Sequence, residues 1–253
     1  MARKIVCLDA GHGDHDSGAV GPNGLKEKDA NLEVVLLAEE YLKPYVDVVL
    51  TRRTDKFLSL SDRPAISNAA NADVFVSYHF NAGSRTVKLS WEIFTSRGQN
   101  RSDILADKIG LAHDSFFSNS QSMRADRSDG DLDKEANFTV ITGTRCPACL
   151  MEGEFISTPH GELSIRNNVN QRMRARAVAV GVLDFLEIPH TLKKWDTSND
   201  AGVTIIAEPT TDGEVVDKLL YVIGENNKLI ASMKSDAEKL EKINEHLKEA
   251  VEA

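Results

Sequence analysis

His and Asp residues crowd a glycine-rich stretch that directly follows an apolar run near the N-terminus. Residues 5–8, IVCL, are apolar and partly β-branched, which is typical of a buried strand, and residues 9–19 read DAGHGDHDSGA. Gly11 and Gly13 flank His12, and because they carry no Cβ they let another group approach it closely. An imidazole at the carboxyl end of a strand is well placed to bind a metal ion or to act as a base.

Three further ionisable residues occur where predicted elements begin or end. Glu27 lies at the start of a predicted helix, His79 directly follows a predicted strand at 73–78, and Glu152 closes another predicted strand. In sheets of parallel strands, ligands bind beyond the carboxyl ends of the strands. We therefore expect His12, His79 and Glu152 to lie at one edge of the sheet.

Each of these residues also has a structural explanation. His12 can cap the loop, Glu27 can be an acid favoured by the helix dipole, and His79 can be a hydrogen-bonded core histidine. Taken singly, these explanations are the better ones, and only the surrounding motifs change the balance. Glu152 differs, because an acid that follows a buried strand is costly unless it is paired or linked to a metal ion.

Apolar runs alternate with segments of helical periodicity over residues 1–188. This alternation predicts an α/β fold, with a mostly parallel twisted sheet of about six strands flanked by helices. Residues 118–135 are polar and predict a surface loop. The expected strands are 5–8, 47–51, 73–78, 89–95, 138–141 and 148–152, and the expected helices are 29–42, 61–70, 102–117 and 163–185.

Composition and charge limit the classes of partner. The chain has 253 residues, of which 41% are hydrophobic, so it is long enough for one full core. Its formal net charge of −9 argues against broad binding to nucleic acid or to anionic membranes. The apolar runs are far shorter than the ~20 residues that cross a bilayer, which predicts no membrane insertion.

The first residues and the cysteines bear on where the protein is made. The N-terminus, MARK, leads straight into the first strand, so we expect synthesis in the cytoplasm without a signal peptide. Three cysteines, an odd number, argue for a reducing compartment. Cys146 and Cys149 have CxxC spacing, but a zinc site of that type needs two further ligands at matching spacing, which leaves a redox role open.

The C-terminal part of the chain follows a different pattern. We predict a first domain over residues 1–188, a linker over 189–212 with a short strand at 203–206, and a helical module over 213–253. Apolar residues in this module recur at alternating steps of three and four, which is the heptad pattern of a coiled coil. The module is expected to target the protein or to form a homo-oligomer, and the alternative is one amphipathic helix packed on its own chain.

Four ordered motifs carry a resemblance to a known family. They read LDAGHGDHDSGAVGPNGLKEKDANL, LTRRTDKFLSLSDR, ADVFVSYHFNAG and CPACLMEGEFIS, and the match covers residues 4–186. This part of the chain resembles zinc-dependent N-acetylmuramoyl-L-alanine amidases of the amidase-3 type, phage endolysins among them. Similarity to that family implies cleavage of bacterial peptidoglycan at the amide between the lactyl group of N-acetylmuramic acid and L-alanine.

The resemblance also implies roles for individual residues. It implies a zinc ion held by His12, Glu27 and His79, with Glu152 as the catalytic carboxylate. The residue types suit this chemistry, because catalytic Zn²⁺ usually takes three protein ligands and leaves a fourth position for water, whose pKa it lowers to roughly 7. A neighbouring carboxylate can accept the proton of that water and return it to the departing nitrogen.

Several nearby residues are weaker candidates. Glu154 stands where the family usually has glycine, and it is an alternative to Glu152 as the catalytic acid. Asp9 and Asn81 either orient the histidines or make ordinary hydrogen bonds at strand ends. Arg63 is expected to form a structural ion pair.

Two other functions remain compatible with these residues. The chain can be a wall-binding protein that keeps the fold and cuts nothing, or a zinc peptidase that cuts within the stem peptide. All four expected metal and acid positions are filled, which counts against the first alternative. The expected synthesis without an export signal, combined with a wall substrate, favours release during phage lysis.

Overall fold

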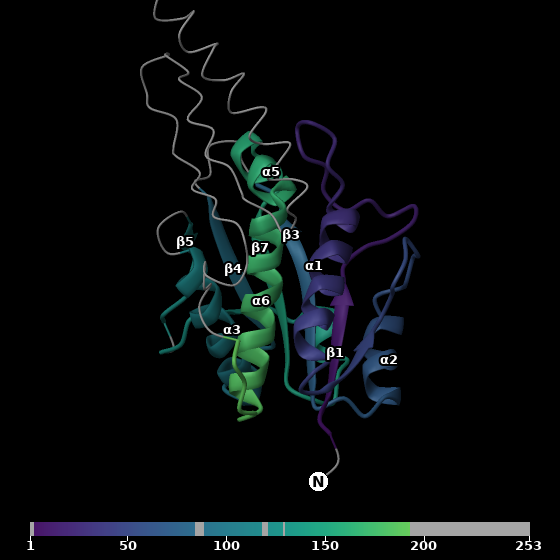
Figure 1. Ribbon diagram of the computed structural model, residues 1–253, viewed down its shortest axis with the longest axis vertical. Coiled ribbons are helices and arrows are strands. Elements are labelled where there is room, and N and C mark those ends of the chain that lie inside the picture. The colour runs from purple at the N-terminus through teal and green to yellow at the C-terminus, as the bar shows by residue number, and fades with distance from the viewer. Residues whose placement is uncertain (1–2, 84–88, 118–120, 129, 193–253) are drawn as a thin grey trace, which may run out of the picture. The chain divides into compact units, whose positions relative to one another are not determined.

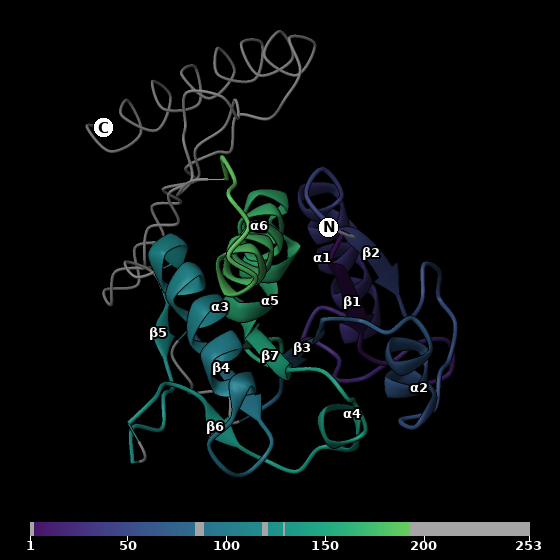
Figure 2. The ribbon, with the colours of Figure 1, turned by 90° about the horizontal axis from the view of Figure 1, so that it is seen from below.

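One mixed β-sheet organises residues 3–83, 89–117, 121–128 and 130–192, which are the residues that the computed structural model describes. Its strands are β1 (Ile5–Ala10), β2 (Asp47–Leu50), β3 (Val74–Asn81), β4 (Ser90–Thr95), β5 (Ser122–Met123), β6 (Lys134–Glu135) and β7 (Ala148–Phe155). The strand order is β2-β1-β3-β7-β4-β5, of which β1, β3, β7, β4 and β5 are labelled in Figure 1, and β6 also pairs with β4 (Figure 2). Every pair is parallel except β4 with β7.

Helices lie on both sides of this sheet (Figure 2). They are α1 (Glu27–Leu42), α2 (Asp62–Ala69), α3 (Arg101–Phe117), α4 (Thr139–Thr142), α5 (Pro159–Arg166) and α6 (Asn168–Phe185). Helices α1, α3 and α6 pack on one face, which we call the α6 face, and α2 and α4 lie on the other, the α4 face. The prediction of an α/β fold with about six strands flanked by helices is thus confirmed.

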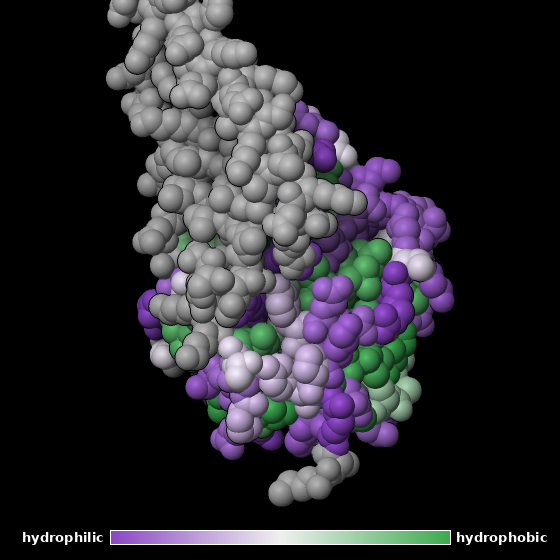
Figure 3. Space-filling model, in the orientation of Figure 1, coloured by the Kyte–Doolittle hydropathy of each residue, from purple (hydrophilic) through white to green (hydrophobic). Residues whose placement is uncertain are grey.

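The main core lies between the sheet and the α6 face helices. Strand side chains such as Val6, Val76 and Met151 are buried there together with residues of α1, α3 and α6. A smaller cluster on the α4 face joins Phe75 and Leu150 to residues of α4. Strands that bury both faces read as continuous apolar runs, which is why the sequence marked them clearly. On the outer side of α1 and α6, the coloured surface in Figure 3 mixes hydrophilic residues with smaller hydrophobic patches.

The predicted strand at 138–141 is wrong, because these residues begin the short helix α4. A short apolar run does not distinguish a strand from a buried helical turn. Here Val140 and Ile141 are buried with Phe75 and Leu150 and cover the first residues of β3 and β7 on the α4 face. The helix therefore closes the smaller core without adding a strand to the sheet.

Two further expectations need correction. The single helix expected over 163–185 is two helices, since Asn167 is extended and its side chain accepts hydrogen bonds from the backbone N–H groups of Val169 and Asn170. Such an N-cap marks the beginning of a new helix, so α6 is separate from α5. The polar stretch 118–135, expected to be a loop, contributes β5 and β6, whose two-residue length gives no periodic signal.

The predicted strand at 203–206 and the helical module over 213–253 lie outside the described residues. The domain boundary near residue 188 stays a prediction. Within the described residues, no helix combines the length and apolar character needed to cross a bilayer.

Candidate metal and active site

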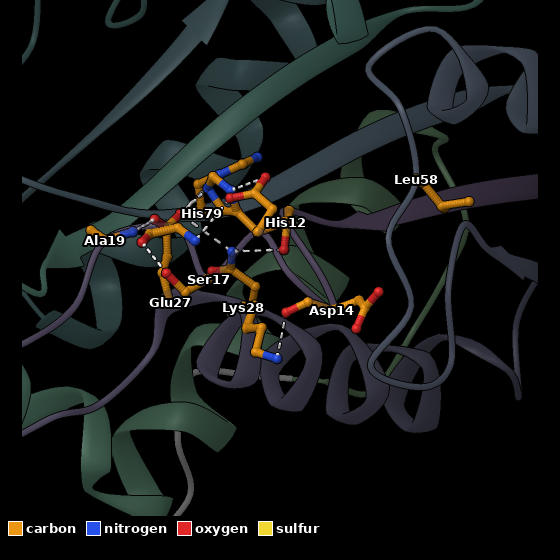
Figure 4. A network of polar contacts seen from close by, with 12 residues as sticks. His12, Asp14, Ser17, Ala19, Glu27, Lys28, Leu58 and His79 are labelled. Atoms are coloured by element: carbon orange, nitrogen blue, oxygen red, sulfur yellow. Dashed lines mark hydrogen bonds and ion pairs between the residues drawn. The ribbon is translucent and has the colours of Figure 1, made fainter.

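Three of the predicted residues come together at the carboxyl ends of β1 and β3. His12 follows β1, Glu27 is the first residue of α1, and His79 lies in β3. Nε2 of His12 lies 3.1 Å from Oε1 of Glu27, and Nδ1 of His79 lies 2.9 Å from the same oxygen (Figure 4). One ligand atom from each residue lies within 4.8 Å of the other two. We call these residues the ligand triad, since together they can hold a metal ion.

The glycine-rich loop fits closely around the ligand triad. A Cβ on Gly11 would lie 2.1 Å from Cε1 of His79. A Cβ on Gly18, whose φ is +62°, would lie 2.5 Å from Oε2 of Glu27. Only residues without a Cβ allow the loop to come this near, and Gly18 also holds a left-handed conformation that suits glycine.

Asp16 orients His12, although the sequence analysis did not single it out. Nδ1 of His12 lies 2.9 Å from Oδ2 of Asp16, and this contact directs Nε2 toward Glu27. Burial works to lower the pKa of His12, but the hydrogen bonds and charges of Glu27 and Asp16 outweigh it and raise that pKa. The available signal was an acid four residues after His12 within the same motif.

Glu27 stays ionised despite its burial. Glu27 is 4% exposed, and its Oε2 accepts a hydrogen bond from the backbone N–H of Ala19 at 2.9 Å. Burial works to raise the pKa of Glu27, but the hydrogen bonds and charges of His12 and His79 outweigh it and lower that pKa well below the ordinary value. Glu27 thus supplies the negative charge that a cation in the ligand triad needs.

On the α4 face, side chains change from apolar to acidic toward the end of β7. Ala148 and Leu150 are buried, and Glu152, the next residue on that face, is the register partner of His79 in β3. Partner residues in adjacent strands are separated by the strand spacing of about 4.8 Å. Glu152 therefore stands directly beside the ligand triad.

Glu152 lies in surroundings that oppose its ionisation. Its Oε2 is buried and, among the described residues, has no hydrogen-bond partner. Burial is the largest cause that raises the pKa of Glu152 well above its ordinary value, and the charges of Glu27 and Glu92 add to it. A cation in the ligand triad would favour the carboxylate, because a nearby opposite charge stabilises the charged form.

Glu154, the lower-ranked acid, lies on the other face of the sheet. The pairing of β3 with β7 shifts register after Glu152, and the side chain of Glu154 then lies on the α6 face. Its Oε1 accepts hydrogen bonds from the backbone N–H groups of Ser90 (3.1 Å) and Phe155 (2.9 Å), and its Oε2 lies 4.0 Å from Nη2 of Arg174 in α6. Glu154 is fully buried, and this burial raises its pKa to about 7. The sheet separates it from the ligand triad.

Asp9 contacts other side chains and not the imidazole rings. It forms the ion pair expected for Arg63, whose Nη1 lies 2.8 Å from Oδ1, and it accepts hydrogen bonds from the hydroxyls of Thr51 (2.6 Å) and Ser77 (2.7 Å). Nη2 of Arg63 donates to the backbone oxygen of His12 at 3.0 Å. Asp9 thus holds the guanidinium of Arg63 in the position from which it donates to the backbone of the glycine-rich loop.

Asn81 also bonds away from the histidines. Its Nδ2 donates to Oε1 of Glu92, and its Oδ1 accepts from the backbone N–H of Ala82 at 2.7 Å. Glu92 lies in β4 and is the register partner of Glu152. The sequence analysis did not single out Glu92, although a charged residue within an otherwise apolar strand was the available signal.

The cysteines are unpaired thiols. Cys149 is fully buried, and Sγ of the half-buried Cys146 lies 3.8 Å from the hydroxyl oxygen of Ser67. Burial raises the pKa of both thiols, so little thiolate forms at ordinary pH. The surroundings of these two cysteines therefore do not support the redox role that their CxxC spacing left open.

Comparisons with known proteins agree with this arrangement. Residues 6–184 match the amidase-3 family, described as N-acetylmuramoyl-L-alanine amidase. The endolysin of Bacillus phage SPP1 is 33% identical over 190 residues, which cover 73% of this chain and 67% of that protein. YqiI of Bacillus subtilis is 36% identical over 187 residues, covering 73% of this chain and 85% of that protein.

A solved structure shows the same fold. The catalytic domain of CwlV, an N-acetylmuramoyl-L-alanine amidase from Bacillus (Paenibacillus) polymyxa var. colistinus, has a TM-score of 0.65 and 31% sequence identity. The match covers 74% of this chain and 99% of that domain. The chain therefore belongs to the N-acetylmuramoyl-L-alanine amidase family of the amidase-3 type.

Proposed function

We propose that the protein is a zinc-dependent N-acetylmuramoyl-L-alanine amidase that hydrolyses the amide between N-acetylmuramic acid and L-alanine in bacterial peptidoglycan. The observation that carries this proposal is the convergence of His12, Glu27 and His79 on one point, with Glu152 in the adjacent strand. Membership of the family supports the choice of substrate.

The donor atoms of the ligand triad suit zinc. Zinc bonds to His nitrogen and carboxylate oxygen are about 2.0–2.2 Å long, so neighbouring ligand atoms of a tetrahedral site lie roughly 3.3 Å apart. The two contacts of Oε1 of Glu27 with the histidines are 3.1 and 2.9 Å, close to that separation. Two neutral imidazoles and one carboxylate would hold the ion and leave a position free for substrate or water.

The residues around the triad divide the remaining work. When bound, zinc supplies Lewis-acid chemistry, polarising a carbonyl oxygen and making water more acidic. The carboxylate of Glu152 takes a proton from the attacking water as that water adds to the scissile carbonyl carbon. Glu152 then returns this proton to the L-alanine nitrogen, so the carbon–nitrogen bond breaks and a neutral amine leaves. Asp16 holds the His12 ring in place throughout.

Digestion of purified cell walls tests this proposal. The zinc-loaded protein is expected to clear the wall in a zymogram and to release free L-alanine N-termini from intact glycan, as read by mass spectrometry. The Glu152→Ala variant is expected to leave the wall uncut. New N-termini within the stem peptide would make the protein a peptidase, and wall binding without any new terminus would make it a binding protein.

The cellular setting and the C-terminal part extend the proposal. We infer release onto the wall during phage lysis, which the similarity to the SPP1 endolysin supports. We also infer that residues 213–253 target the enzyme or form a homo-oligomer, because of their heptad pattern. Light scattering of the full chain and of a chain ending near residue 190 tests the oligomer. If each of the two chains has the mass of its own monomer, the oligomer is ruled out.

A further inference from the structure

The row of side chains that begins at His79 and Glu152 continues into β4. Glu92 is the register partner of Glu152, and it lies on the same face of the sheet, so the three residues follow one another across three adjacent strands. Glu92 is 5% exposed. The Glu92 carboxylate therefore lies beyond Glu152 as seen from the ligand triad.

Two cationic side chains, each more than 30 residues from Glu92 in the sequence, lie next to the Glu92 carboxylate. Nζ of Lys134 in β6 contacts Oε2 of Glu92, and Nη1 of Arg124, which directly follows β5, lies 3.5 Å from the same oxygen. The other carboxylate oxygen accepts the hydrogen bond from Asn81. Both carboxylate oxygens of Glu92 therefore have partners. These contacts hold the side chains of Lys134 and Arg124 next to the row formed by His79, Glu152 and Glu92.

Lys134 and Arg124 share one carboxylate, that of Glu92, so the formal charge of these three residues is +1. Asp126 lies near enough for the charge of Lys134 to help lower its pKa. An ammonium has three donors and a guanidinium five. The side chains of Lys134 and Arg124 are 27% and 45% exposed. The guanidinium of Arg124 also lies over the ring of Phe155, 5.0 Å from its centre, which limits its movement. These cations keep donors for a further anion and present them to solvent in fixed positions.

The spacing of the row suits the second residue of a stem peptide. Adjacent strands lie about 4.8 Å apart, so the β4 backbone at Glu92 is one strand spacing from Glu152 and about 10 Å from His79. An extended peptide advances roughly 3.4 Å per residue. A peptide whose scissile amide lies between the ligand triad and Glu152 can therefore bring its second residue, the one after alanine, to Lys134 and Arg124.

We propose that Lys134 and Arg124, held by Glu92, form a carboxylate-binding subsite that selects stem peptides with a free carboxylate on the residue following alanine. This inference rests on the proposed function, because it uses the scissile amide to set the direction of the peptide. Planar carboxylates suit a guanidinium and an ammonium that approach from one side.

Two matched substrates test the subsite. One is a muramoyl dipeptide whose second residue carries a free carboxylate, and the other carries a primary amide in its place. With the full zinc-loaded chain, kcat/KM is expected to favour the free acid by about tenfold or more, as for a charge-assisted hydrogen bond. In Lys134→Gln and in Arg124→Gln this ratio is expected to fall, and in the double variant to approach one.

The ratio separates recognition from damage to the fold, because a misfolded fraction lowers both rates equally. Lys108→Gln on α3 makes the same charge change on the opposite side of the sheet and is expected to keep the wild-type ratio. No preference in the wild type, or an unchanged ratio in the double variant, would overturn the subsite. Lys134 and Arg124 would then serve only as ion pairs that join β4 to the neighbouring strands.

Binding measurements keep this test independent of turnover. In the full-chain Glu152→Gln protein, calorimetry is expected to give about tenfold tighter binding of the free acid. Adding Lys134→Gln is expected to weaken that preference, and adding Arg124→Gln as well is expected to remove it. If neither compound is cut by the wild type but the binding preference is present, the amidase proposal fails while the subsite stands. Equal binding of the two compounds overturns the subsite.

Discussion

The two faces of the sheet treat acidic residues in opposite ways. On the α4 face, Glu152 follows a short apolar cluster and stands beside the ligand triad with one oxygen that lacks a partner among the described residues. On the α6 face, Glu154 is enclosed by the main core and engaged by two backbone N–H groups, near Arg174. Two glutamates separated by one residue therefore lie in different surroundings, one beside the ligand triad and the other within the main core.

The cause of this difference is a local shift in strand pairing. Because β7 holds one more residue than β3 between two successive register pairs, the side chains after Glu152 change face. Gly153 accommodates the shift, since a Cβ there would lie 2.0 Å from the hydroxyl oxygen of Tyr78. A single extra residue thus decides which acid lies on the face of the ligand triad. Variants on each face can test this division.

Loss of a triad ligand is expected to have the largest effect. His79→Ala removes one of the three ligand atoms, so bound zinc measured by mass spectrometry is expected to fall well below one per chain and wall hydrolysis to fall to background. His160→Ala, at an exposed histidine of α5, is the matched control and should keep both. Full activity in metal-free His79→Ala protein would contradict a metal at this site.

Glu152→Gln is expected to lower kcat by about 10²- to 10⁴-fold, because the amide cannot carry the proton that general acid–base catalysis moves. Zinc content and thermal unfolding should stay close to those of the wild type. The paired variant Glu154→Gln tests the other face and should keep its zinc and a much larger share of its activity. If Glu154→Gln abolished activity while Glu152→Gln retained it, the assignment of the two faces would be reversed.

Glu154→Gln is expected to change how stability depends on pH. Burial raises the pKa of Glu154 to about 7 from an ordinary value of 4.5, so the folded wild type binds more protons than the unfolded chain between these values. Its contribution to stability is fully present below pH 4.5 and is lost as pH rises through 7.

The variant lacks this titration. Between pH 5 and pH 8, the unfolding free energy of Glu154→Gln should therefore rise relative to that of the wild type by roughly 2–3 kcal/mol. Urea unfolding at both pH values measures this difference. A constant difference across that range would show that Glu154 does not titrate in the folded protein there.

Asp16→Asn is expected to give the smallest of these effects. Loss of the carboxylate that holds the His12 ring should weaken zinc binding by about 10- to 100-fold, as for other partners of metal-bound histidines. Competition with a chromophoric chelator measures the affinity. Asp14→Asn, in the same loop but with an exposed carboxylate, is the control. Equal affinities in the two variants would remove Asp16 from the metal site.

The sequence by itself determined the strands that carry the site and the residues at their ends. The apolar runs of β1, β3 and β7 are local patterns, and buried parallel strands produce them directly. The triad residues stand at the ends of such elements within recognisable motifs, so their chemistry could be predicted before their geometry was known. The short helix α4 was missed because an apolar run of only four residues with one threonine, FTVI at 138–141, has no decisive period.

Only the tertiary structure decided the neighbours of those residues. The pairing of Glu152 with His79 on one side and with Glu92 on the other depends on the register of three strands far apart in the chain, which no local pattern encodes. The approach of Lys134 and Arg124 depends on two short strands within a stretch that reads as a loop. Alternation along a strand is a local property of the backbone, whereas register, bulges and ion pairs are set by partners that meet only when the chain has folded.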